Sequence, residues 1–176
     1  ASGSVGFTDL EKKIPLSSDA IFRIASMTKA LTSSAFLLLA ERENLAMDTP
    51  VESILEEFKD LKVAKLENDA IHYESPHSKI TFHQLLTHTS GFGYDFHHQT
   101  LSHLLQQGEI ADLLDKEGKF LNAPLIEQPG TYWHYGIGIG WLGKVIEKLS
   151  GQSLNDFMTE NVFEPLEMHE TSFDIS

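Results

Sequence analysis

Apolar side chains recur every three or four positions in the segment that starts at Met27, and polar or small residues fill most of the positions between them. This spacing places them on one face of a helix that packs against the interior of the protein. We expect the helix to span residues 27–43 and to end at Asn44, because asparagine tolerates the left-handed conformation found just past helix ends. The apolar positions are Leu31, Ala35, Leu38 and Leu39.

The remaining elements are marked by helix caps and turn residues. Thr81 and Gln84 have the T-x-x-Q spacing of a capping box, and Ser153 precedes Asp156 at the same spacing. Glycines indicate where helices end, and Asn68-Asp69 indicates a chain reversal between two strands. Helix dominates and clear strands are few. The expected elements are a short helix over 51–58, a hairpin of 61–66 and 71–74, a short helix from Thr81, a helix over 101–116 interrupted at Gly108, a helix over 139–149 closed by Gly151, and a helix from Ser153 towards Val162.

The composition is that of one ordinary globular domain, since 176 residues with 41% apolar and 22% charged side chains can bury a core. The 13 basic and 26 acidic residues give a formal net charge of −13, which repels nucleic acids and anionic lipid surfaces. The absence of cysteine excludes disulfides, a thiol nucleophile and thiolate metal sites. No stretch approaches the roughly 18 apolar residues of a membrane span, and the N-terminus lacks the pattern of a signal peptide. The sequence does not identify the cellular compartment, although a cytoplasmic location is slightly favoured.

Ser26 and Lys29 stand three residues apart at the start of the long helix, so their side chains share a face. A serine hydroxyl is a weak nucleophile, and a lysine whose ammonium form is disfavoured by burial can accept its proton. The positive end of the helix dipole favours the developing alkoxide. Taken alone, however, S-x-x-K is more often an N-cap serine followed by a solvated lysine, so the motif needs support from its surroundings.

That support comes from a resemblance to a known family. Residues 19–32, DAIFRIASMTKALT, resemble the nucleophile region of class C β-lactamase-like serine hydrolases, which are related to penicillin-binding proteins. The resemblance continues, in family order, through ERENLAMDTPV (41–51), ITFHQLLTHTSG (80–91), QPGTYWHY (128–135) and EPLEM (164–168). It implies an α+β fold, of which this chain carries the helical portion, with Ser26 as the nucleophile.

The same resemblance implies that Tyr135 shares a proton with Lys29 beside the nucleophile. A phenol can act as a base only if a nearby cation lowers its pKa, and Lys29 would be that cation. The chain departs from the family pattern at Ile137, where the family commonly has Asn. An amide there could bind an amide substrate, whereas isoleucine cannot, so Ile137 and Trp133 are expected to contact substrate and to favour esters or thioesters. The Trp-x-Tyr-Gly segment at residues 133–136, followed by a helix start rich in Gly and Trp, resembles the fungal esterase and transesterase branch of the family.

Two alternatives stay open beside a small-molecule esterase or acyltransferase: a β-lactamase or D-amino-acid peptidase, and an inert binding or scaffold protein with the same fold. The backbone N–H of Ser26 is expected to be one oxyanion-hole donor. The family's third motif, a Lys or His two residues before Gly on a sheet-edge strand, supplies the other donor and is missing from the chain. We therefore expect residues 1–176 to be a partial β-lactamase-like domain whose partner is the remainder of the same enzyme. Lacking that donor, the isolated chain would lose about a hundredfold to a thousandfold in turnover.

Two further patterns are typical of other kinds of site, a nucleotide-binding loop and a metal site. Residues 138–143 match GxGxxG, but the preceding segment makes a poor buried strand, so close helix packing explains the glycines more simply. His97, His98 and His103 invite a metal site, but no H-x-x-x-H pair with a catalytic glutamate accompanies them. We expect neither a metal nor a cofactor. His88 is a family marker that we interpret as structural.

Overall fold

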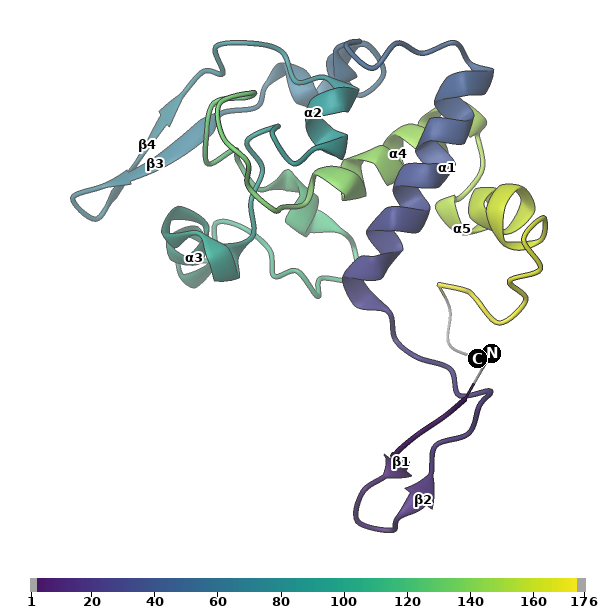
Figure 1. The fold of residues 1–176 in the computed structure, drawn as a ribbon. Helices are drawn as coiled ribbons and strands as arrows, with labels where there is room; N and C mark the ends of the chain where they lie inside the picture. The colour runs from purple at the N-terminus through teal and green to yellow at the C-terminus, as the bar shows by residue number, and fades with distance from the viewer. Residues whose placement is uncertain (1–2, 174–176) are drawn as a thin grey trace.

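Helix α1 (Thr28–Arg42) runs through the centre of the molecule and packs along α4 (Gly138–Ser150), as Figure 1 shows. The structure, a computed structural model, describes residues 3–173. A 3-10 turn, Ala25–Met27, leads directly into α1. The expected helix over 27–43 is confirmed, and Asn44 has the left-handed conformation, with a φ of 53°. The helix ends there because the backbone reverses its handedness.

The shorter helices pack against these two. Helix α2 (Phe82–Leu86) begins with the expected capping box, in which the Thr81 hydroxyl accepts the N–H of Gln84 and the Gln84 side chain accepts the N–H of Thr81. Helix α5 (Leu154–Met158) is capped by Ser153 and continues as a π-helical turn, Thr159–Phe163. Both predictions of caps are confirmed, because each depends only on residues that are neighbours in the chain.

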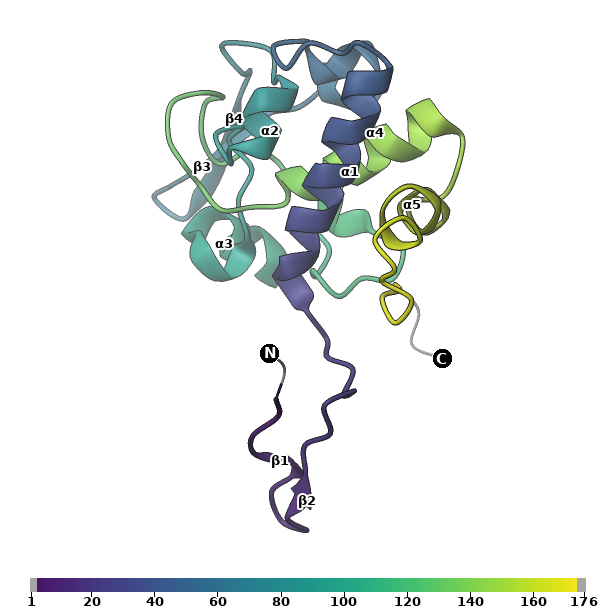
Figure 2. The ribbon, with the colours of Figure 1, turned by 45° about the vertical axis from the view of Figure 1, so that its right-hand side comes forward.

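Strands make up a small part of the fold. Within residues 3–173 they form two antiparallel pairs, β1 (Phe7–Asp9) with β2 (Ile14–Pro15) and β3 (Val63–Glu67) with β4 (Ala70–Glu74). The β3–β4 hairpin turns at Asn68 and Asp69, which both have a positive φ, so the expected reversal is confirmed. The β1–β2 hairpin extends away from the helical body (Figure 2).

Two expectations about helices were wrong in part. The predicted helix over 101–116 is limited to α3 (Gln99–Gln106), because Gly108 takes a φ of 73° and ends it. The following residues form turns in which carboxylates of Asp112 and Asp115 accept backbone N–H groups, an alternative to helical bonding. The predicted helix over 51–58 is instead two 3-10 turns, Val51–Ser53 and Glu56–Lys59. Two more 3-10 turns are Asp95–His97 and Lys119–Asn122.

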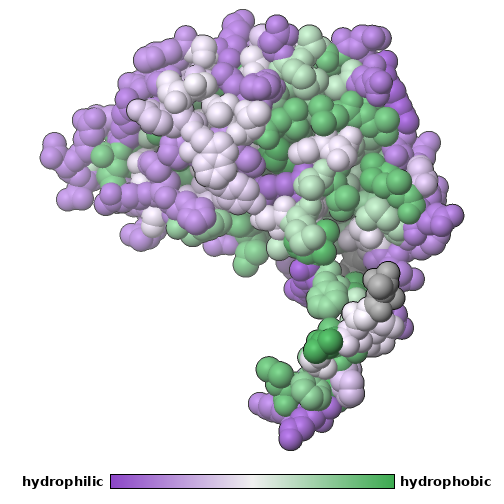
Figure 3. Space-filling view, in the orientation of Figure 1, coloured by the Kyte–Doolittle hydropathy of each residue, from purple (hydrophilic) through white to green (hydrophobic). Residues whose placement is uncertain are grey.

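Aromatic side chains fill the space between the helices. The rings of Phe36 and Phe82 lie 5.1 Å apart, and Trp141 meets Phe58 edge-on at 5.1 Å. A separate group of apolar side chains is exposed on the β1–β2 hairpin, on residues 16–24 that follow it, on the 3-10 turn before α1 and on α1, as Figure 3 shows on one face. That group is Phe7, Leu10, Ile14, Ile21, Phe22, Met27 and Leu37. No helix in residues 3–173 combines the length and the apolar character needed to cross a membrane.

Candidate active site

The serine of the S-x-x-K motif lies in the 3-10 turn before α1, and the lysine lies in the first turn of α1. The Lys29 ammonium donates a hydrogen bond of 3.1 Å to the Ser26 hydroxyl. Ala25, immediately before the serine, has a φ of 44°. A non-glycine residue rarely adopts this left-handed conformation, and such strain is concentrated at functional sites. The strained turn presents the exposed Ser26 hydroxyl at the positive end of the helix.

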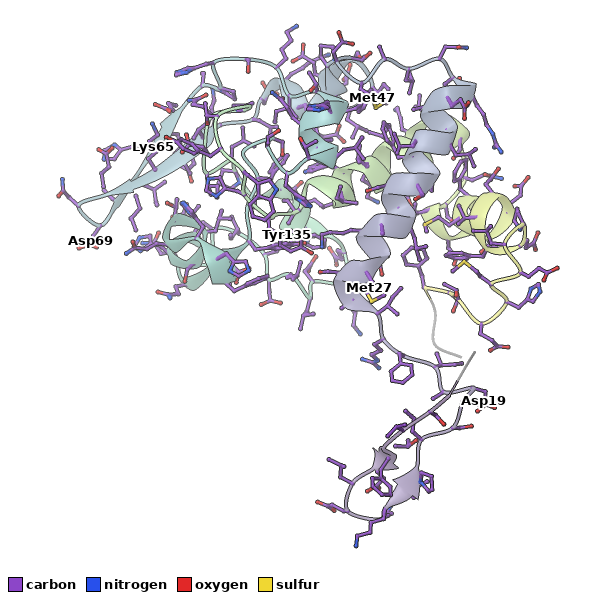
Figure 4. The ribbon with its side chains drawn as sticks, viewed as in Figure 1. Asp19, Met27, Met47, Lys65, Asp69 and Tyr135 are labelled. Carbon is purple, nitrogen blue, oxygen red and sulfur yellow. The ribbon has the colours of Figure 1, made fainter. Side chains whose placement is uncertain are left out.

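Tyr135 comes from a distant part of the chain and lies beside these two residues. It precedes α4, and Figure 4 shows its side chain next to the first turns of α1. The Lys29 nitrogen lies 4.9 Å from the centre of the Tyr135 ring. The three predicted residues Ser26, Lys29 and Tyr135 are therefore brought together in one place.

A second phenol, that of Tyr94, also lies beside the Lys29 ammonium. Its ring centre lies 5.3 Å from the lysine nitrogen, and its side chain is 7% exposed. The ring is 5.6 Å from that of Tyr135. Sequence reasoning missed Tyr94, because it lies in a loop without periodicity, and its only signal was its position three residues after Gly91.

The pKa values of Lys29 and Tyr135 are shifted in opposite directions, and the shift of Lys29 differs from the one expected from the sequence. Burial by itself lowers the pKa of Lys29, but hydrogen bonding and charge interactions with Tyr94 and Tyr135 outweigh it, so this pKa is raised. Burial by itself raises the pKa of Tyr135, but hydrogen bonding with Ser26 and Lys29 and the charge of the lysine outweigh it, so this pKa is lowered. Burial does disfavour the ammonium form of Lys29, as expected, but the net shift of its pKa is upward, so the expectation of a lysine that readily loses its proton is wrong. The positive charge of Lys29 instead favours the ionised form of the Tyr135 phenol.

His88 fixes the segment that carries Tyr135. Its backbone carbonyl accepts the N–H of His134 at 2.8 Å, and its ring nitrogen Nδ1 accepts the N–H of Gly136 at 3.4 Å. The imidazole ring lies 4.8 Å from the Tyr135 ring. Burial, and then the charge of Lys29, lower the pKa of His88, so that a neutral ring that can accept a hydrogen bond is favoured. These contacts support a positioning role.

A pocket of about 370 Å³ opens beside Tyr135. Trp133, one of the two residues expected to contact substrate, lines it and is 64% exposed. Ile137, the other, is 4% exposed and belongs to the core. It does not line this pocket, because the chain turns into α4 at that point and directs the side chain inwards.

A profile of the Beta-lactamase family matches residues 1–176. The chain belongs to the Beta-lactamase family. Monacolin J acid methylbutanoyltransferase of Aspergillus terreus is 34% identical over 163 residues, which cover 90% of this chain and 39% of the transferase. Esterase EstB of Burkholderia gladioli is 34% identical over 176 residues, which cover 96% of this chain and 42% of the esterase.

Solved structures show the same relationship for this Beta-lactamase family chain. Unliganded simvastatin synthase (LovD) from Aspergillus terreus matches it with a TM-score of 0.77 at 33% identity, over 90% of this chain and 40% of the synthase. The resemblance inferred from the sequence motifs and the α+β fold class are thus confirmed. The chain spans about 40% of the length of the curated relatives it matches.

The glycines of residues 138–143 serve helix packing in this family member. A Cβ atom on Gly140 would lie 2.9 Å from the Leu121 side chain, and one on Gly143 would lie 3.1 Å from Leu154. A larger residue at either position would therefore require the Leu121 or Leu154 side chain to move. Residues 3–173 contain no cluster of three or more histidine, cysteine, aspartate or glutamate side chains suited to a metal ion.

Proposed function

We propose that the chain supplies the nucleophile and proton-transfer groups of a serine esterase or acyltransferase acting on carboxylic esters or thioesters. Ser26 is the nucleophile, Tyr135 the base and Lys29 the cation that lowers the pKa of the phenol. The observation that carries the proposal is the position of the Lys29 ammonium, 3.1 Å from the Ser26 hydroxyl and 4.9 Å from the Tyr135 ring centre.

In the acylation step the Ser26 oxygen attacks the carbonyl carbon of the ester, and its proton passes to the Tyr135 phenolate. The carbonyl oxygen becomes an oxyanion, for which the backbone N–H of Ser26 is one donor. When the tetrahedral intermediate collapses, the bond to the leaving alcohol or thiol breaks. That group takes the proton from Tyr135, so the acyl-enzyme forms with the phenolate restored.

Deacylation repeats these steps with a new partner. Water or an alcohol gives its proton to Tyr135 and attacks the acyl carbon, and the Ser26 oxygen leaves and recovers the proton. Hydrolysis and acyl transfer differ only in which molecule attacks. Dividing one difficult displacement into two such steps requires no cofactor.

The relatives support the ester or thioester reading, since two of them are named as a methylbutanoyltransferase and an esterase. We propose that residues 1–176 act as part of a longer β-lactamase-like domain, with a small-molecule ester or acyl substrate.

The test is a burst assay with p-nitrophenyl butyrate, together with labelling by a fluorophosphonate probe, on the native gene product. The variant Ser26→Ala is expected to abolish both signals. Its matched control is Ser34→Ala, which removes an exposed hydroxyl from the helix that follows Ser26 and is expected to keep both signals. Equal labelling of the Ser26→Ala variant and the wild type would contradict the proposal. Absence of any burst would favour an inert binding protein, and rapid turnover of nitrocefin would favour a β-lactamase.

A further inference from the structure

The pocket beside Tyr135 is formed by two separate segments and one further residue. Its walls come from the segment before α3, from Ile126 and from residues 133–135, and the lining includes Tyr135, the base of the proposed reaction. Ser26 is not among the lining residues. The pocket is therefore adjacent to the group that exchanges a proton with the alcohol oxygen in both steps of the proposed reaction. At about 370 Å³ it falls within the range of small-molecule sites.

The lining has aromatic and imidazole side chains and no formal charge that is permanent at neutral pH. No Asp, Glu, Lys or Arg of residues 3–173 is among the residues that line it. Burial, and then the charge of His134, lower the pKa of His98, with Glu127 acting in the opposite direction, so the neutral ring is favoured. The Nδ1 atom of His98 is buried without a hydrogen-bond partner. Flat apolar walls with uncharged polar atoms suit a ring system, and a charged group there would lose its hydration without a partner.

We infer that this pocket binds the alcohol partner of acyl transfer, as leaving group or acceptor, and selects an uncharged alcohol that carries an aromatic or other flat apolar ring. The inference rests on the proposed function and goes beyond it by assigning one substrate component to one pocket. Trp133 at the rim and His98 in the wall are the residues that determine this selectivity.

The experiment forms the acyl-enzyme of the native gene product with vinyl butyrate, whose leaving group is too small to need the pocket. The acyl-enzyme is then offered methanol or benzyl alcohol, and the two ester products are quantified. Trp133→Ala is expected to lower the ratio of benzyl to methyl ester by about two- to tenfold, the usual contribution of one aromatic contact. His98→Ala is expected to lower the same ratio, and serves if the first variant does not fold. The control His72→Ala changes an exposed imidazole on β4 and is expected to leave the ratio unchanged.

Charged acceptors test the second half of the inference. Transfer to 4-(hydroxymethyl)benzoate and to 4-(aminomethyl)benzyl alcohol is expected to be at least about tenfold slower than transfer to benzyl alcohol. The lining holds no charged partner for either group, and the Lys29 ammonium, 4.9 Å from the Tyr135 ring centre, already interacts with that phenol. Equal rates would overturn the selection for uncharged alcohols.

The outcomes separate failure of this inference from failure of the proposed function. If Trp133→Ala and His98→Ala instead slow acylation by vinyl cinnamate relative to vinyl butyrate, and leave the acceptor ratio unchanged, the pocket holds the acyl group and the inference is wrong. An acceptor ratio and a donor preference that both stay at wild-type values would also overturn it. A wild-type protein that forms no acyl-enzyme with either donor would refute the proposed function itself.

Discussion

The glycine that follows Tyr135 allows two segments of backbone to approach more closely than any side chain permits. A Cβ atom on Gly136 would lie 2.4 Å from the Phe92 carbonyl oxygen and 2.8 Å from the Gly93 α-carbon. Both of these atoms belong to the backbone, so no side-chain rotation can relieve the overlap. The substitution Gly136→Ala must therefore move one segment relative to the other.

The size of this movement follows from the distances. Ordinary contacts of a Cβ atom begin near 3.4 Å, so the segment that carries Tyr135 would shift by about 1 Å. Overpacking of this kind typically costs about 1–3 kcal/mol of unfolding free energy. A displacement of about 1 Å in a reacting group can lower turnover by about a hundredfold. We expect Gly136→Ala to reduce both stability and the rate of ester turnover.

Urea denaturation and p-nitrophenyl butyrate hydrolysis measure the two effects. Gly140→Ala is the matched control, because the same methyl group would meet only the end of the Leu121 side chain, at 2.9 Å, on a helix where alanine is favoured. The control is expected to keep wild-type turnover and stability close to that of the wild type. A Gly136→Ala variant with wild-type stability and turnover would refute the reasoning about close approach.

Three further substitutions test other contacts. If Tyr135 is the base, kcat/KM rises with pH as the phenol ionises. Burial raises the pKa of Tyr135, but Ser26 and Lys29 together hold it below its ordinary value. Lys29→Met is therefore expected to move the rising limb of the pH–rate profile to higher pH. Gln128→Leu removes an amide that donates to Glu74 at 2.7 Å and accepts the N–H of His77 at 2.8 Å, and is expected to cost about 1–3 kcal/mol in urea denaturation. Thr81→Ala removes half of a capping box and is expected to cost about 1 kcal/mol, measured in the same way.

Matched changes at exposed positions serve as controls for the stability measurements. Lys144→Met breaks an ion pair with Glu147 on the surface and is expected to cost less than about 1 kcal/mol. Ser34→Ala removes a hydroxyl that bonds within α1 and is expected to have little effect. If Gln128→Leu or Thr81→Ala destabilised the protein no more than these controls, the corresponding contact would not be a source of stability. A pH limb that stayed in place in the Lys29→Met variant would contradict the role of Tyr135 as base.

Local features of the fold were predictable because they depend on residues close together in the chain. The capping box at Thr81, the reversal at Asn68-Asp69 and the left-handed Asn44 each follow from the chemistry of a few neighbouring side chains. The same reasoning was wrong for residues 107–116, where apolar periodicity competed with Gly108 and with carboxylates that bind the backbone. Periodicity records which residues can share a face, and it does not record which local hydrogen bonds prevail.

The sequence alone determined the likeness to a family, and it was sufficient to predict Ser26, Lys29 and Tyr135 as candidate catalytic residues, because family motifs are read from the order of residues. Only the tertiary structure decided what surrounds them. Three features depend on how distant segments pack. They are the contact of Tyr94 with Lys29, the hydrogen bonds of His88 to the Tyr135 segment and the burial of Ile137. The direction in which the pKa of Lys29 shifts also depends on the tertiary structure, because packing of the whole chain sets the distances to Tyr94 and Tyr135.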